Sequence, residues 1–303
     1  ELLLSTNGLT KQYGHHKAVD KVNLHIKKGA IYGFIGQNGA GKTTCLKMIS
    51  GLARPTAGEI EMFGCKGKEL ERIRSRVGCL IEAPGLYGNM NAYTNLKIKC
   101  ELFGIRKKGY IEDILETVGL EGVGKKKTKH FSLGMKQRLG IGLALVGEPD
   151  LLVLDEPING LDPQGIAEVR DTIQRLRDER NMTILISSHI LEELSKIATD
   201  YGIIHNGSLL QELTSEELMK RCSERIEIEL IHPEQAVPIL DRMGFTNYQV
   251  TDKEHIHIFE RLNESAALNM ELAKAGIPVK GISITSEELE TYFLNLTGGA
   301  DHA

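Results

Sequence analysis

The sequence predicts an α/β core followed by a smaller α+β domain. Three short runs are almost entirely apolar, as expected of parallel strands that are buried on both faces. These runs cover residues 30–35, 151–154 and 183–186. Helical segments lie between them, and this alternation of buried strands with helices is typical of α/β folds. After about Thr214 the elements become shorter and change order, so we expect two domains, residues 1–214 and 215–303.

Other segments complete the predicted core. Residues 2–28 alternate apolar and polar positions around a turn at Tyr13 and Gly14, which predicts antiparallel strands. From residue 84 to about 147 the apolar spacing becomes helical, and residues 165–181 predict a further helix. We therefore expect an antiparallel and a helical part beside the parallel sheet.

The C-terminal residues predict the order β-α-β-β-α-β, which is the ferredoxin-like arrangement. The predicted strands are 225–231, 245–250, 255–259 and 279–284, the predicted helices 233–243 and 264–275, and a last helix covers 287–296. This domain has two interpretations: a module that supports a dimer, which we prefer, and a sensor of a small ligand. The fold alone does not indicate the second.

Composition excludes several classes of protein. The 303 residues are 41% hydrophobic, which suits a globular core, and carry a net charge of −4, which does not suggest binding to nucleic acid. No apolar stretch approaches the ~18 residues that span a bilayer, and no secretory signal is visible. Five scattered cysteines lack metal-binding spacing. We expect a reduced, cytoplasmic protein in which Cys45 is a core residue and not a reactive thiol.

The most informative segment is a glycine-rich loop between the first buried strand and a helix. It matches the phosphate-binding pattern G-x-x-x-x-G-K-[ST] at every required position. Glycines let backbone N–H groups approach phosphates, Lys42 is expected to contact the β- and γ-phosphates, and the Thr43 hydroxyl to bind Mg²⁺. The residues expected to bind a nucleoside triphosphate are Gly36, Gln37, Asn38, Gly39, Ala40, Gly41, Lys42, Thr43 and Thr44.

Two acidic residues end the second buried strand. Asp155 is placed to reach Mg²⁺ directly or through water, and Glu156 to orient and deprotonate the water that attacks the γ-phosphate. The alternative is that both residues only cap the next helix. A complete phosphate-binding loop in the same chain favours the catalytic interpretation.

A third signal is weaker on its own. Ser132 and Gly134 stand at the start of a predicted helix, about twenty residues before the Asp155 strand. A helix N-terminus is a ready anion site, although a plain helix cap would explain the same residues.

Over residues 1 to about 214, the chain resembles the nucleotide-binding subunit of an ATP-binding-cassette (ABC) transporter, and the motifs occur in the order that this family has. The resemblance implies a P-loop NTPase fold with antiparallel and helical subdomains that binds ATP and Mg²⁺ and hydrolyses ATP. Residues 36–44 are similar to the Walker A loop, 151–156 to the Walker B strand and 132–137 to the signature motif.

The resemblance also implies roles for single residues. Tyr13 stands where the family stacks an aromatic side chain on adenine. His189 matches the switch histidine, which contacts the γ-phosphate and holds the catalytic water in line. Asp162 belongs to the D-loop, and Ser132 and Gly134 offer a hydroxyl and a backbone N–H to the γ-phosphate.

Two positions depart from the family pattern. The signature motif lacks one glycine, with Met135 in its place, which stiffens the turn. Glu82 replaces the usual Q-loop glutamine, and we include it among the catalytic and metal-binding residues. Its added charge is expected to hold the metal more tightly but to repel the γ-phosphate, and the sequence leaves both effects open.

The resemblance further implies partners. Each ATP of the family lies between the Walker A loop of one copy and the signature motif of another, so a homodimer is expected. Separate membrane permease subunits are implied, with this chain on the inner face of the cell membrane. At the two departures and at residues 292–294, the sequence resembles one branch of the ABC transporters. That branch expels bacitracin and lantibiotic peptides and thereby confers resistance. The alternative is a soluble ABC ATPase acting on ribosomes or nucleic acid.

Overall fold

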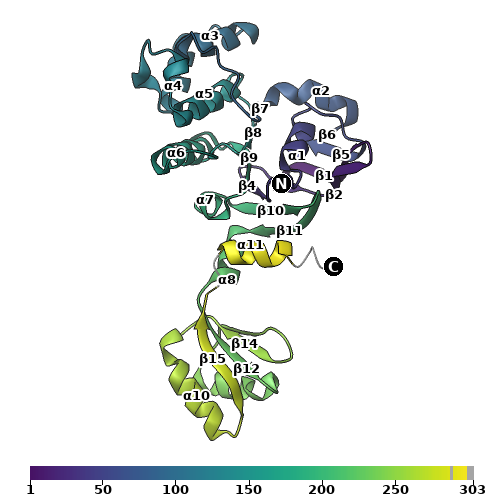
Figure 1. Ribbon diagram of the computed structural model, residues 1–303, viewed down its shortest axis with the longest axis vertical. Helices are drawn as coiled ribbons and strands as arrows, with labels where there is room; N and C mark the ends of the chain where they lie inside the picture. Colours follow the sequence, from purple (N-terminus) through teal and green to yellow (C-terminus); the bar gives the residue numbers. More distant parts are fainter. Residues whose placement is uncertain (287–288, 299–303) are drawn as a thin grey trace. The chain divides into compact units, whose positions relative to one another are not determined.

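The computed structural model describes residues 1–286 and 289–298. The chain forms two compact units, Glu1–Ser215 and Glu216–Ala303 (Figure 1). Each unit has its own hydrophobic core, and each is described separately below.

The first unit is built on a six-stranded sheet in the order β11-β10-β4-β9-β8-β7. β11 pairs antiparallel with β10, and the other neighbours pair in parallel. Every residue of β4, β8 and β9 is buried, which confirms the three apolar runs as strands of a parallel sheet. The strands are β4 (Ile31–Ile35), β7 (Val77–Leu80), β8 (Leu151–Asp155), β9 (Thr183–Ser188), β10 (Asp200–His205) and β11 (Ser208–Thr214).

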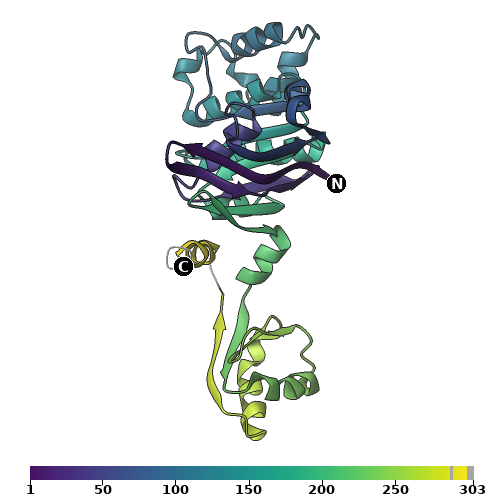
Figure 2. The same ribbon diagram turned by 90° about the vertical axis from the view of Figure 1, so that its right-hand side faces the viewer.

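A second sheet of the first unit is antiparallel, in the order β2-β1-β5-β6 with β3 also paired to β1. Figure 2 shows its long strands β1 and β2, in purple, side by side. The antiparallel strands expected over residues 2–28 are thus confirmed. The strands are β1 (Leu2–Tyr13), β2 (His16–Val22), β3 (His25–Lys27), β5 (Ala57–Met62) and β6 (Cys65–Lys66).

The main core of this unit joins the two sheets around helix α1 (Lys42–Ile49). Leu9 of the antiparallel sheet, Phe34 of the parallel sheet and Leu46 of α1 are fully buried in one cluster. Cys45 belongs to the same cluster, and burial raises the pKa of its thiol to about 12. Cys45 is therefore a core residue, as expected. The core fixes α1 between the sheets, and so fixes the loop that precedes α1.

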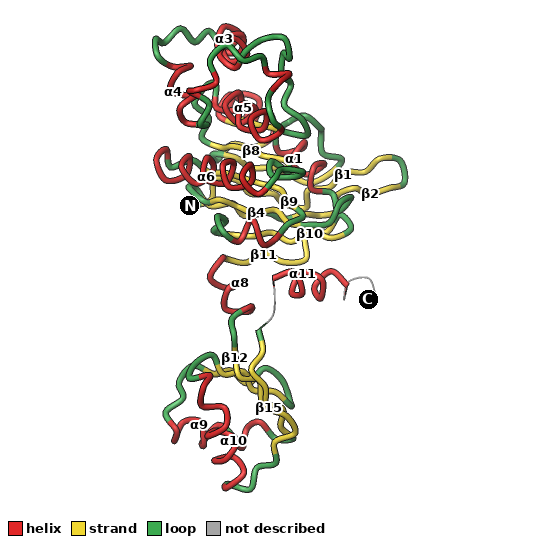
Figure 3. Tube along the Cα trace, turned by 60° about the vertical axis from the view of Figure 1, so that its left-hand side comes forward, coloured by secondary structure: helices red, strands yellow, loops and turns green. Residues whose placement is uncertain are grey.

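Two of the remaining helices of the first unit, α5 and α6, cover the parallel sheet. α3, α4 and α5 contact one another and gather at one end of the unit (Figure 3). α5 also contacts β7 and β8, and α6 contacts β9. The predicted helical region is confirmed. The helices are α2 (Leu70–Ile73), α3 (Ala92–Leu102), α4 (Tyr110–Thr117), α5 (Leu133–Leu145), α6 (Pro163–Arg180) and α7 (Leu191–Ser195).

The second unit contains an antiparallel sheet in the order β13-β14-β12-β15. Apolar residues of β12 and β14 form a core with α9 and α10, and the alternate residues of these two strands form a polar face. The order β-α-β-β-α-β is present, as predicted. The elements are α8 (Ser215–Cys222), β12 (Arg225–Leu230), α9 (Val237–Met243), β13 (Tyr248–Val250), β14 (His255–Ile258), α10 (Ser265–Lys274), β15 (Val279–Thr285) and α11 (Leu289–Gly298).

Two predicted elements of this unit are shorter than expected. The single helix predicted over 233–243 is divided into a 3-10 turn, Pro233–Gln235, and α9. Pro238 lies in the first turn of α9, where a missing N–H costs no hydrogen bond within the helix. The strand predicted from Phe245 begins only at Tyr248, since Phe245 turns into the core after α9. Of the last predicted helix, residues 287 and 288 lie outside the described residues.

Candidate nucleotide-binding and catalytic site

The topology of the parallel sheet brings the predicted site residues to one edge. The glycine-rich loop follows β4, Asp155 ends β8 with Glu156 directly after it, and His189 follows β9. Because β4, β8 and β9 are parallel neighbours, their carboxyl ends meet at the same edge. Ligands of open α/β sheets bind at this edge.

The glycine-rich loop is shaped by close approaches to its surroundings. Gly41 has φ +104°, and a Cβ atom there would lie 2.4 Å from the carbonyl oxygen of Ala18. At Gly36, a Cβ would lie 2.6 Å from the carbonyl oxygen of Ile204. Larger residues at either position would displace the backbone, so the loop requires glycine where the phosphate-binding pattern does.

Lys42 is 95% buried, and its ammonium group has partners within the chain. Its Nζ donates hydrogen bonds to the carbonyl oxygens of Gly36, at 2.6 Å, and Gln37, at 3.1 Å. It also forms an ion pair with Oε1 of Glu156 at 3.0 Å. The predicted phosphate-binding lysine and the predicted catalytic carboxylate are therefore partners of each other.

Asp155 is buried and accepts hydrogen bonds at both oxygens. Thr43 Oγ1 donates to Oδ2 at 2.8 Å, and Ser187 Oγ donates to Oδ1 at 2.6 Å. A hydroxyl next to a carboxylate is an oxygen donor set that suits Mg²⁺. These contacts place two of the three predicted metal ligands, Thr43 and Asp155, beside each other.

Glu156 is held in a strained position with one oxygen left without a hydrogen bond. Its φ is +48°, which is uncommon outside glycine and occurs at functional sites. Oε2 lies 2.8 Å from Nδ1 of His189. Oε1 is buried, and no described residue donates a hydrogen bond to it, although Lys42 is in ion-pair distance. Release of the Lys42 ion pair would leave this buried oxygen as an acceptor for a proton from water.

A cavity of about 380 Å³ opens above these residues. Asn38, Gly39, Gly41, Lys42, Thr43 and Thr44 line it from the loop, together with Tyr13, His16, Ala18 and Glu156. Gln37 and Ala40 do not line the cavity. A hydrogen bond from Ala40 N to the carbonyl oxygen of Gln37 stabilises the turn of the loop. The cavity is large enough to hold a small-molecule ligand. Its lining of lysine, hydroxyl groups and glycine-rich backbone suits phosphates.

Tyr13 is half exposed at the rim of this cavity. It pairs across the antiparallel strands with His16, and the Nζ of Lys11 lies 5.0 Å from its ring centroid. This position leaves the ring available for stacking, and its contact with adenine stays a prediction. Sequence reasoning did not include His16, because only the cross-strand register brings it beside Tyr13.

Ser187 is a candidate site residue that sequence reasoning missed. It is fully buried, donates to Asp155 and accepts the Glu156 N–H at 2.9 Å. One hydroxyl thus fixes both acidic residues. Polar serines at the end of an otherwise apolar strand are the signal that could have revealed it.

We expect Ser187→Ala to lower kcat for hydrolysis by roughly 10-fold or more with little change in KM, because small misplacement of reacting groups is costly. Steady-state kinetics would measure both constants. Thr183→Val is the control, since it removes another buried hydroxyl at the opposite end of the same strand. An unchanged kcat in Ser187→Ala would leave the serine without a positioning role.

The predicted residues of the signature motif and the D-loop lie outside the cavity lining of their own chain. Ser132 caps α5 by accepting a hydrogen bond from Met135 N at 3.2 Å, and Asp162 caps α6 through Gly165 N at 3.1 Å. Gly134 packs against Gly165. The helix thus starts regularly in spite of Met135. The roles of Ser132, Gly134 and Asp162 in nucleotide binding stay predictions.

Glu82 also lies apart from the cavity lining. It follows β7, has φ +65°, and its side chain is 64% exposed. Its carboxylate forms an ion pair with Lys47 of α1 at 2.5 Å. This hydrogen bond, together with weaker effects of the Glu82 and Asp155 charges, raises the pKa of Lys47. Glu82 therefore carries its charge beside a cation, and its metal contact stays a prediction.

The chain is similar to known proteins in sequence and in fold. The family model for ABC transporters matches residues 19–159. The bacitracin transport ATP-binding protein BcrA of Bacillus licheniformis is 45% identical over 98% of each chain.

The chain belongs to the ATP-binding subunits of ABC transporters.

Other similarities agree with this membership. The lantibiotic transport ATP-binding protein SrtF of Streptococcus pyogenes is 44% identical over 69% of this chain and 90% of its own. A solved ATP-binding subunit of an ABC transporter matches 72% of this chain and 92% of its own, with 29% identity and a TM-score of 0.63.

Membership in this family confirms several expectations. This ABC subunit binds ATP and is an ATPase of the transport-coupled type. These relatives are transport proteins, which does not favour an action on ribosomes or nucleic acid. Within the described residues, no helix is both long and apolar enough to cross a membrane.

Proposed function

We propose that this ABC subunit drives the expulsion of an antimicrobial peptide, of the bacitracin or lantibiotic kind, and so protects the cell that makes or meets it. It acts from the cytoplasmic face of the membrane, and separate permease subunits carry the peptide. The observation that carries this proposal is the full-length similarity to a bacitracin transport subunit, which includes the C-terminal unit.

The site residues suggest how this chain hydrolyses ATP. Lys42 exchanges the Glu156 carboxylate for the phosphates, which releases Glu156 to accept a proton from the attacking water at Oε1. His189 holds the other carboxylate oxygen, and the buried Ser187 keeps the backbone of Glu156 in place. Mg²⁺, bound by Thr43 and Asp155, would neutralise charge on the phosphates. The short contacts within this group support these roles.

We further propose that two copies of the chain complete each site. Ser132, Gly134 and Asp162 lie outside the cavity lining of their own chain, although the family uses such residues at the nucleotide. A two-fold symmetric dimer would bring these residues of one copy to the cavity of the other. Loss of the γ-phosphate then removes a contact between copies, so that hydrolysis opens the dimer.

Lys47 is expected to offset the charge of Glu82. Lys47→Gln should lower the Mg²⁺ concentration that gives half-maximal hydrolysis by about 2- to 5-fold, the size typical of an exposed ion pair, because the unbalanced Glu82 carboxylate then attracts the metal. The double variant Lys47→Gln/Glu82→Gln should reverse most of this change, because the unbalanced carboxylate is then gone. Mg²⁺ titrations of the four proteins in a double-mutant cycle measure the coupling.

Two other outcomes are informative for Glu82. Additive effects of the two substitutions would contradict the charge balance. Identical Mg²⁺ curves for Glu82→Gln and the unchanged chain would remove Glu82 from the metal site and assign it to contact with the permease.

An exposed apolar groove next to Glu82 is our candidate for the permease contact. A cavity of about 390 Å³ is lined by Ile81 and Ala83, which flank Glu82, and by residues of helix α3. Leu52, Tyr87, Leu102 and Phe103 on this cavity are between 50% and 80% exposed. Large apolar side chains gathered in this way mark interaction sites. A partner bound here would reach the catalytic edge through Glu82.

Affinity purification from the host's detergent-solubilised membranes tests the proposal. The bait is the tagged Glu156→Gln chain with ATP, and the expected result is recovery of one or two multi-span proteins. Leu102→Asp in the same bait should reduce this recovery, whereas Leu294→Asp, a change at another exposed leucine, should not. Recovery of ribosomes or of soluble partners without a membrane protein would overturn the transport function.

A further inference from the structure

The second unit contains a cavity of about 470 Å³ on the polar face of its sheet. Arg225 of β12 and His257 of β14 line it from this face, together with Gln249 and Phe259. Lys220 and Arg221 of α8 and Tyr292 of α11 also line this cavity. All of these residues belong to the same unit. The volume falls within the range of pockets that bind small molecules.

The charge of this cavity is mainly positive. Its lining includes the cationic side chains Lys220, Arg221 and Arg225 and a single carboxylate, that of Glu217. Three cations and one carboxylate give the lining an excess of positive charge, which attracts anions. A negatively charged ligand is the partner that this lining favours.

Arg225 is the most buried of the three cations, with its side chain 13% exposed. It donates one hydrogen bond, from Nη1 to the carbonyl oxygen of Arg221 at 3.1 Å. The Glu227 carboxylate lies 3.8 Å away, beyond hydrogen-bond distance, and no described residue accepts from Nε. A guanidinium has five N–H donors, and leaving them unused when buried is costly. Arg225 therefore retains capacity for an acceptor.

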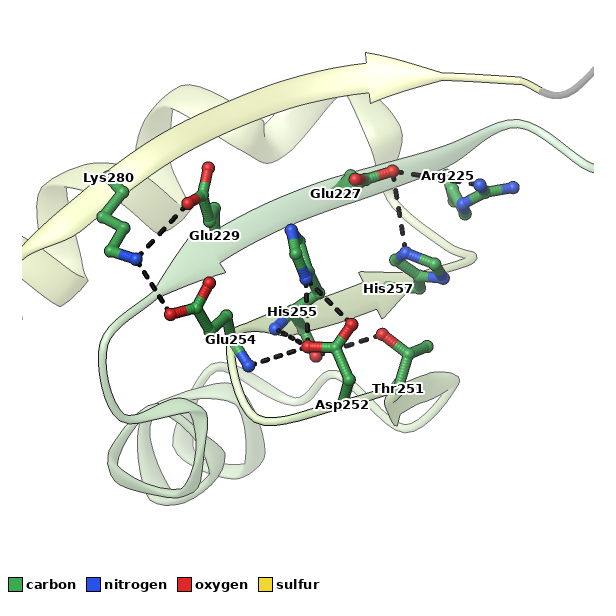
Figure 4. Close-up of polar contacts among 9 residues, drawn as sticks. All are labelled: Arg225, Glu227, Glu229, Thr251, Asp252, Glu254, His255, His257 and Lys280. Atoms are coloured by element: carbon green, nitrogen blue, oxygen red, sulfur yellow. Dashed lines mark hydrogen bonds and ion pairs between the residues drawn. The ribbon is translucent and has the colours of Figure 1, made fainter. Parts of the chain in front are cut away.

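Figure 4 shows Arg225 and His257 near each other across β12 and β14, with Glu227 between them. His257 is also only loosely paired, since its Nε2 lies 3.6 Å from Glu227. The Glu227 carboxylate therefore lies near both groups but is too far from either to accept a hydrogen bond from it. This arrangement differs from the nearby contact of His255 with Asp252, which is as short as 2.9 Å.

The cavity also offers apolar surface. The ring of Phe259 meets the ring of His257 edge to face at 6.3 Å. Tyr292 accepts a hydrogen bond from Arg221 at 2.8 Å through its hydroxyl, which fixes the side chain that forms part of the wall. Cationic groups beside aromatic rings suit a ligand that has both an anionic head and an apolar body.

We propose that this cavity binds a small organic anion that carries a carboxylate or phosphate group on a ring or short apolar chain. Arg225 and Lys220 bind the anionic head, and Phe259 and Tyr292 contact the apolar body. The second unit is then a ligand-binding module in addition to any role in a dimer. This site is independent of the phosphate-binding loop and does not rest on the transport function.

Phenyl phosphate is a suitable probe because it combines a dianion with an aromatic ring. The full-length chain, with MgADP at saturation to occupy the phosphate-binding loop, would be titrated and followed by NMR of labelled histidine side chains. We expect a saturable shift of the His257 signal at millimolar probe or below, with the His255 signal shifting much less. Absence of a saturable shift of His257 would overturn the proposal.

A second readout is the titration of His257 itself. Burial lowers the pKa of His257, and the Arg225 charge and that of His255 lower it further, whereas Glu227 and Asp252 act in the opposite direction. A bound anion stabilises the imidazolium, so the pKa should rise when the probe is present. An unchanged pKa in the presence of saturating probe would place the probe outside this cavity.

Variants separate the site from general ionic attraction. Arg225→Gln and Lys220→Gln should each weaken binding at least ~10-fold, the loss expected of a charge-assisted hydrogen bond. Lys274→Gln removes an exposed cation of the same unit outside the lining and should bind normally. Lys220 is exposed, so its replacement tests the site even if Arg225→Gln does not fold. Equal affinities in all variants would overturn the proposal.

Discussion

Glu156→Gln is expected to slow ATP hydrolysis at least ~100-fold while ATP binding is retained. General bases contribute this much or more to the rate. The amide keeps the size of the side chain, so His189 and the strained backbone retain their places. It cannot accept a proton from water at the position of Oε1, which is buried and accepts no hydrogen bond from a described residue.

Phosphate release and nucleotide binding should be measured on the same preparation. Glu179→Gln is a matched control, because this exposed residue of α6 lies outside the cavity lining. Turnover near that of the unchanged chain would show that another group acts as the base.

Lys42→Ala should weaken nucleotide binding at least ~10-fold and abolish most turnover. A hydrogen bond to a charged group is worth about 1.5–3 kcal/mol, which corresponds to roughly 10- to 100-fold in affinity. In this chain the loss also leaves the Glu156 carboxylate, 18% exposed, without its cation. The remaining negative charge then faces the γ-phosphate directly.

Equilibrium binding of a fluorescent ATP analogue measures this loss, and thermal unfolding verifies that the variant is folded. Lys68→Ala, a change at an exposed lysine, should bind normally. Unchanged affinity in Lys42→Ala would limit the lysine to a role in the chemical step.

The parts of the fold that sequence predicted share a strong local signal. β4, β8 and β9 are buried on both faces, so their apolar runs stand out. β7 was missed because it is short and contains Gly78, and β10 because it contains Gly202 and has polar ends. Only pairing with their neighbours defines them as strands. The local pattern of apolar residues indicates which strands are buried. The pairing of strands depends on contacts between segments that are distant in the sequence.

The same distinction applies to the site. The glycine-rich loop and the Asp155–Glu156 pair were predictable, because their chemistry is carried by adjacent residues. Ser187 and His16 were not, since each acquires its place from a neighbouring strand. The pairing of Glu82 with Lys47 was equally hidden, as these residues are 35 positions apart in the sequence.

The ion pair between Lys42 and Glu156 also affects what a binding experiment reports. Incoming ATP has to compete with a tethered internal anion, so the apparent dissociation constant combines the intrinsic affinity with the cost of opening that pair. Neutralising Glu156 removes the competitor. The glutamine variant should therefore hold ATP more tightly than the unchanged chain, even before any difference in hydrolysis is considered.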